Sequence, residues 1–188
     1  MIERPGLGNS AHAEPLLRRA ALWAADCADL ALPVFEAIAP ADNRARDAID
    51  GARQFGLGGK RDKGLRTLAW AAHAAASESD APSAKYAARS AMLAAAVAYT
   101  HTDLTIGKQG INQARHLLGP AVYAALACEA SSDTKAGIAE NILQTTASSA
   151  PVDVFTLLRQ FPLQPRGATR LGQLFHDLDS RLRQAFGG

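Results

Sequence analysis

Histidine is the side chain here best suited to metal binding or proton transfer. Three of the five histidines, His73, His101 and His116, fall in central helical segments. If residues 62–76 and 82–101 form an antiparallel pair of helices, a rise of about 1.5 Å per residue separates His73 from His101 by roughly 19 Å. These two histidines therefore cannot share a metal ion. The same arithmetic brings His101 and His116 within about 8 Å in height, so this pair can meet.

A polar line follows one face of the next predicted helix, where Gln113, His116, Pro120 and Tyr123 lie. The line supplies no nucleophile, no paired carboxylates and no third metal ligand. Three interpretations stay open: structural hydrogen bonds near a helix junction, contacts with a partner, or else catalysis or a ligand, the ligand in a pocket lined by His101, His116 and Tyr123. No catalytic residue, no metal site and no cofactor is predicted.

Charged residues at 42–50 form a second candidate site. Arg44 and Arg46 lie in one helical turn and could clamp an anion. Asp42 and Asp50 lie four residues before and after Arg46, however, and this spacing favours ion pairs on a solvated face. Asp26 lies beside a buried stripe, where a carboxylate needs a partner, so a structural salt bridge is expected there.

Residues 56–60 (GLGGK) look superficially like a phosphate-binding loop. They follow a helix rather than a strand, and they lack the Lys-Ser/Thr ending that holds phosphate and magnesium. We interpret them as a helix stop followed by a turn.

Helices must position all these residues, because no segment alternates with the period of a strand. Caps and apolar stripes predict an all-α bundle of about seven to eight helices in a single domain, residues 1–188. Residues 1–13 are expected to form a flexible arm, with the first helix beginning near Pro15, and residues 161–168 a Pro-rich connector before the last helix. Pro120 predicts a bend near residues 115–119.

Two almost uncharged, alanine-rich runs, residues 70–76 and 91–98, are expected to be buried between other helices, since alanine favours helix and lets helices approach closely. Whether the Trp70 side of its helix is covered by the chain or by a second subunit is left open. The outer helices show clearer stripes. The first is expected to bury Leu16, Ala20, Trp23, Cys27 and Leu30; the last is expected to bury Leu171, Leu174, Phe175, Leu178, Leu182 and Ala185, with His176, Asp177, Arg181 and Arg183 outward.

Composition limits the function classes. The net charge of +2 is too small, and the basic residues too scattered, to indicate nucleic-acid binding. No apolar run is long enough to span a membrane, and no signal peptide is recognised at the start of the sequence. Cys27 and Cys128 match neither a zinc site nor a disulfide framework, so a reducing, cytoplasmic location is expected.

Several segments, taken in order, resemble one family. They are residues 23–28 (WAADCA), 32–36 (LPVFE), 42–46 (DNRAR), 48–53 (AIDGAR), 69–76 (AWAAHAAA), His101, 113–119 (QARHLLG), Tyr123 and 178–183 (LDSRLR). Together they resemble the immunity proteins of bacterial polymorphic toxin systems, an alanine-rich family predicted to be helical. The loop at residues 105–110 is longer and more glycine-rich than the family pattern.

The resemblance implies a non-catalytic protein that binds and silences a cognate toxin. Under this hypothesis Asp26, Arg44, Arg46, His73, His101, Gln113, His116 and Tyr123 are the candidate partner-binding or ligand-binding residues. The alternatives are a small-molecule or nucleotide binder that uses the His101/His116/Tyr123 pocket, and a helical enzyme with an unrecognised site. No nucleic acid and no membrane is expected as a partner, and homo-oligomerisation is left open.

Overall fold

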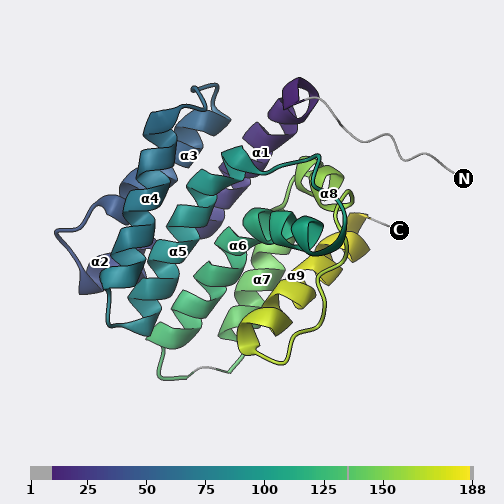
Figure 1. The fold of residues 1–188 in the computed structure, drawn as a ribbon. Helices are drawn as coiled ribbons and strands as arrows, with labels where there is room; N and C mark the ends of the chain where they lie inside the picture. Colours follow the sequence, from purple (N-terminus) through teal and green to yellow (C-terminus); the bar gives the residue numbers. More distant parts are fainter. Residues whose placement is uncertain (1–9, 135, 187–188) are drawn as a thin grey trace, which may run out of the picture.

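The computed structural model describes residues 10–134 and 136–186 (Figure 1). The prediction of an all-α protein is confirmed, with nine α-helices, one 3-10 helix and no strand in these two ranges. The α-helices are α1 (Ser10–Asp29), α2 (Leu32–Ile38), α3 (Arg44–Gly56), α4 (Lys63–Glu78), α5 (Pro82–Ala96), α6 (Gly107–Ser131), α7 (Ile138–Ser149), α8 (Val152–Leu158) and α9 (Arg170–Phe186), and the 3-10 helix η1 covers Val97–Tyr99.

Local signals explain most helix boundaries. Asp62 caps α4, since its Oδ1 accepts hydrogen bonds from the backbone N–H groups of Gly64 and Leu65 at 2.9 and 3.3 Å. Pro33 stands at the start of α2, which is a separate helix after α1. Residues 56–60 end α3 and turn the chain, with Gly58 at φ +111°, as the helix-stop interpretation requires.

Helix α5 lies at the centre of the bundle and packs against α1, α2, α3, α4 and α6 (Figure 1). Its alanine-rich run is buried as expected, because helices surround it on several sides. Helix α4 differs, since it lies at the edge of the bundle and packs on α3 and α5. Its inner alanines are buried, but Trp70 is 65% exposed, so the run at residues 70–76 has one uncovered side.

Helix α6 contains Pro120 and continues past it. Figure 1 shows α6 changing direction along its length, which is the effect expected of proline inside a helix. The buried Ser90 of α5 donates a hydrogen bond of 2.6 Å to the Pro120 carbonyl oxygen. Next to it, Gly119 lets the two helices approach closely, because a Cβ built there would lie 2.4 Å from Cδ1 of Leu93.

Several sequence expectations need correction. Helix α1 begins at Ser10 rather than near Pro15, so residues 10–13 are helical, and residues 1–9 of the expected arm lie outside the described ranges. Leu30, expected in the buried stripe, is 44% exposed because α1 ends one residue earlier. Ala185 is also exposed, in the last turn of α9.

No helix in the part of the chain that the structure describes is long and apolar enough to cross a bilayer.

Candidate functional site

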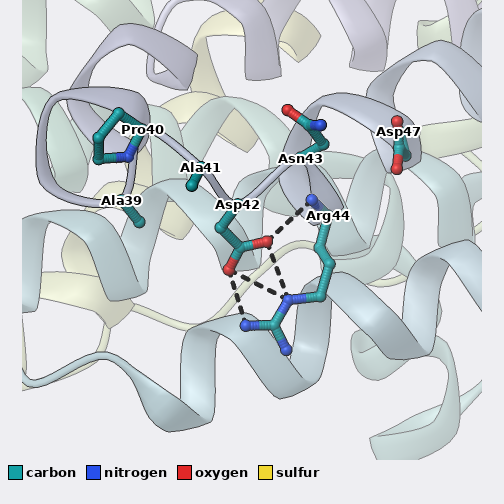
Figure 2. A pocket seen from close by; sticks show the side chains of 7 residues that line it. All are labelled: Ala39, Pro40, Ala41, Asp42, Asn43, Arg44 and Asp47. Carbon is teal, nitrogen blue, oxygen red and sulfur yellow. Dashed lines mark hydrogen bonds and ion pairs between the residues drawn. The ribbon is translucent and has the colours of Figure 1, made fainter.

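The connection between α2 and α3 forms an open pocket of about 580 Å³ on the surface (Figure 2). We call it the α2–α3 pocket; its lining is Ala39, Pro40, Ala41, Asp42, Asn43, Arg44 and Asp47. The pocket exists because α2 ends at Ile38, just before Pro40, and the chain must turn before α3. Asp42 fixes the start of α3, because its Oδ1 accepts the Arg44 backbone N–H at 3.0 Å.

Arg44 is held by two carboxylates at the edge of this pocket. Its Nε and Nη2 donate to Asp42 at 2.9 and 2.7 Å, and Nη2 also lies 2.7 Å from Oε2 of Glu78 on α4. These hydrogen bonds from Arg44 lower the pKa of both carboxyl groups and raise the pKa of the guanidinium. Arg44 therefore serves as a bridge between α3 and α4, and an anion would have to displace carboxylates to reach it.

The remaining polar side chains of the pocket face away from this cluster. Figure 2 shows Asn43 and Asp47 away from the Asp42–Arg44 pair. Both residues are exposed, and among the described residues neither side chain has a hydrogen-bond or ion-pair partner. The pocket thus offers two acceptor side chains, the amide of Asn43 and the carboxylate of Asp47, to a hydrogen-bond donor.

Arg46 does not form the two i,i+4 pairs expected with Asp42 and Asp50. It pairs instead with Glu36 of α2 through Nη2. The prediction of a solvated, ion-paired face is sound, but its partners are wrong, because packing of α2 beside α3 offers a closer carboxylate than the helix itself does.

Asp26 forms the salt bridge that the sequence predicts. Its Oδ1 lies 3.2 Å from Nη2 of Arg53 on α3, and the same nitrogen lies 2.5 Å from Oδ2 of Asp29. Asp50 is also near, at 3.6 Å from Nη1 of Arg53. Asp26 is on the surface, with 74% of its side chain exposed, so this cluster joins α1 to α3 at the rim rather than inside the core.

His73 contacts the exposed indole of Trp70 on α4, with ring centroids 5.6 Å apart at 79°. This edge-to-face contact supports one side of Trp70. Among the described residues, no ring pair or ion pair joins His73 to His101 or His116, in line with the expected separation along the helices.

The structure brings His101 and Gln113 together. Oε1 of the buried Gln113 accepts the backbone N–H of His101 at 2.9 Å. The His101 ring itself is 65% exposed, with Nδ1 3.8 Å from Asp103. The chain leaves the helix before this point, because α5 ends at Ala96 and η1 at Tyr99, whereas a helix to His101 was expected. Structural hydrogen bonding at the helix junction, one of the three interpretations, therefore describes Gln113.

His116 lies half-buried on α6. Burial lowers its pKa, and the nearby His101 lowers it further. Its Nδ1 is buried and has no hydrogen-bond partner within the described ranges.

Tyr123 takes part in an aromatic cluster. Its ring lies 6.1 Å from that of Tyr86 on α5 and 6.4 Å from that of Phe175 on α9. On α6 it follows His116 by two helical turns, or about 10.5 Å. The structure thus places Tyr123 in helix packing. It places His101 in the segment before α6, beside Gln113 and His116 in the first three turns of α6.

One polar cluster was not predicted. Asp179 of α9 is fully buried and binds Arg183, which the sequence placed on the outward face, and the backbone of Gln164. A signal was present, because Asp179 stands four residues before Arg183 and next to the apolar Leu178.

Within residues 10–134 and 136–186, no group of three or more His, Cys, Asp or Glu side chains is arranged to hold a metal ion.

The fold and these contacts define an all-α protein of closely packed helices joined at the surface by ion pairs. Residues 17–106 match the family described as "Imm-5 like putative immunity protein", which confirms the resemblance for the segments up to His101. The resembling segments at 113–119, Tyr123 and 178–183 lie outside this match. The match begins within α1 and ends at Ile106, directly before α6. The glycine-rich loop expected at residues 105–110 is largely helical, because α6 begins at Gly107. No curated protein and no solved structure matches the chain.

Proposed function

We propose that this chain is a non-catalytic immunity protein that binds a cognate bacterial toxin and neutralises it. The observation that carries the proposal is the family match over residues 17–106, which includes the α2–α3 pocket and the ion-paired surface around it. A preorganised helical surface can bind tightly through a few anchoring side chains, without any reaction.

The α2–α3 pocket is the place we propose for contact with the toxin. Asp42 and Glu78 share one cation, Arg44, and Asp47 adds a further carboxylate, so the local charge is negative although the net charge of the chain is +2. A lysine or arginine of the toxin would find acceptors in Asp47 and Asn43. This local acidic surface suits a toxin with a basic contact segment.

The test is co-expression with the product of each gene adjacent to the gene for this chain. We expect one of these products to co-purify with the chain and the cells to survive. Asp47→Lys should weaken binding at least tenfold, because it puts a like charge at the basic segment of the toxin. Asp133→Lys is the matched control, since Asp133 is exposed and lies outside the matched segment. A toxin that neither binds nor is silenced would refute the function, and equal effects of the two substitutions would refute the placement.

A second candidate function is small-molecule or nucleotide binding near His101 and His116. It is favoured by one observation, the buried Nδ1 of His116 without a partner in the described ranges. NMR of the histidine rings during titration with nucleotides tests it. A shift confined to His116 and His101 supports binding, and unchanged resonances contradict it.

A further inference from the structure

Helix α4 presents an uncovered face that meets the proposed toxin-contact surface only at Glu78, the partner of Arg44. We call it the α4 face; its members are Lys63, Arg66, Thr67, Trp70, His73, Ala74, Ser77 and Glu78. Trp70 stands at its centre, one of two central residues in this 16-residue helix. Trp70 is 65% exposed, whereas the other tryptophan, Trp23, is 4% exposed. An exposed tryptophan braced by a neighbouring ring is typical of the centre of a protein interface.

Charge is distributed unequally along the α4 face. The end that begins the helix carries Lys60, Arg61, Lys63 and Arg66, and among the described residues none of the four forms an ion pair. Arg66 instead lies over the ring of Tyr99, 4.8 Å from its centroid. The other end carries Asp80 and Glu78, of which Glu78 pairs with Arg44 of α3 in the same chain but keeps an exposed side chain, and no basic residue stands in the last turn of α4.

This distribution is the reverse of what an isolated helix favours. The start of a helix has a partial positive charge and its end a partial negative charge, so basic residues belong at the end and acidic ones at the start. Asp62 supplies one carboxylate as the cap of α4, but the first turn itself has no acidic residue and contains Lys63 and Arg66. Helix α5 follows α4 after a short turn and runs antiparallel to it, but it covers only the inner side of α4. A second antiparallel helix on the outer side would bring another negative end beside these cations.

We propose that the α4 face pairs with the α4 face of a second copy of this chain, antiparallel, with Trp70 beside the two-fold axis. Residues equally far from the midpoint of the helix then lie at the same height. Lys63 faces Glu78 of the second copy, and Arg61 stands level with its Asp80. Each Trp70 lies over small side chains of the opposite helix, Thr67 and Ala74, which allow close approach. The surface is self-complementary, as a two-fold interface must be.

A single helix face gives a small interface, so the dimer is weak and salt-sensitive. Sedimentation velocity on the full chain from micromolar to millimolar concentration should show a reversible monomer–dimer equilibrium that high salt shifts toward monomer. Quenching of Trp fluorescence by acrylamide reports on Trp70, because Trp23 is buried. The quenching constant should fall as the protein concentration rises.

Substitutions make the test specific. Trp70→Ala should weaken dimerisation at least tenfold, and Lys63→Glu and Glu78→Lys should each weaken it by placing like charges opposite each other. The double variant, Lys63→Glu with Glu78→Lys, should recover most of the dimer, because the exchanged charges match again across the axis. Ile106→Ala and Lys108→Glu are the matched controls, since both residues are exposed but lie away from α4.

Circular dichroism and thermal unfolding of each variant establish that it is folded, and for Glu78→Lys they also measure the effect of losing the Arg44 pair within the same chain. A chain that stays monomeric over the whole concentration range overturns the proposal, as does a double variant no more dimeric than the single ones. If the chain is monomeric and a bound toxin shields Trp70 from acrylamide, the α4 face binds the toxin. That result refutes the dimer while the proposed function stands.

Discussion

Arg183 reaches the buried carboxylate of Asp179 one turn away on α9, with Nε 2.5 Å from Oδ1. The other oxygen, Oδ2, accepts the backbone N–H of Gln164 at 2.7 Å. Arg183 also donates from Nη2 to the carbonyl oxygens of Leu158 and Phe161 at 3.0 and 3.1 Å. The Asp179–Arg183 pair therefore holds the irregular segment that follows α8 against helix α9.

Removing this carboxylate should destabilise the fold. Asp179→Ala leaves the N–H of Gln164 buried without a partner and Arg183 without its carboxylate, so we expect a loss of about 3 kcal/mol in the free energy of unfolding. Urea unfolding followed by circular dichroism measures it. Asp177→Ala on the same helix is the control, because among the described residues Asp177 forms no ion pair, and its effect should stay within about 0.5 kcal/mol. Equal losses in the two variants would show that Asp179 is not a structural anchor.

His116 gives the stability a dependence on pH. Its pKa is lowered in the folded protein, first by burial and then by the charge of His101. The unfolded chain therefore binds a proton more readily, and the folded state loses stability as the pH falls below the ordinary histidine pKa of about 6.5. The loss is complete once the pH lies below the lowered pKa of the folded state.

His116→Gln should reduce this loss, because glutamine does not titrate. We expect the midpoint of thermal unfolding to fall less in the variant than in the parent protein between about pH 7.5 and about pH 5. Asp42, Glu78 and Glu140 have lowered pKa values and destabilise the fold only at more acidic pH, so they leave this window unchanged. Parallel curves for parent and variant would contradict the assignment to His116.

The helices could be predicted from the sequence because their signals are local. The cap at Asp62 and the proline at the start of α2 each act within a few residues. Partners across helices could not be predicted in this way. Arg44 meets Glu78 across 34 positions, and Arg46 prefers Glu36 of another helix to its own i,i+4 neighbours, because tertiary packing decides which carboxylate lies nearest.

Exposure was equally hard to predict for the alanine-rich helices. Alanine is compatible with a buried or an uncovered face, so the runs in α4 and α5 looked alike. Only the packing shows that α5 is surrounded while α4 lies at an edge with Trp70 uncovered. The burial of Asp179 could not be predicted either. Its partner Gln164 lies in a segment without helical periodicity, so the sequence does not show that the two residues meet.

The two tryptophans should differ sharply in their contribution to stability. Trp23 is buried, and its Nε1 donates to the carbonyl oxygen of Thr146 at 3.0 Å, which joins α1 to α7. Trp23→Phe loses this hydrogen bond and leaves a cavity, so we expect a cost of about 2–3 kcal/mol in urea unfolding. Trp70→Phe, measured at low protein concentration, should cost less than about 0.5 kcal/mol, because Trp70 is exposed. Similar costs would contradict the burial assigned to Trp23.

The two cysteines should react slowly in the folded protein. Burial raises the pKa of the Cys27 thiol well above its ordinary value, with the charge of Asp26 adding to the effect, and partial burial raises the pKa of Cys128. Because the thiolate is the reactive form, neither should react quickly with an aromatic disulfide reagent near neutral pH. Cys128, which is only half-buried, should react first. In the Cys128→Ser variant we expect the remaining thiol to become reactive only after unfolding in guanidinium. Rapid labelling of that variant in its folded state would mean that α1 opens at Cys27, contrary to the packing of α1 against α3, α5 and α6.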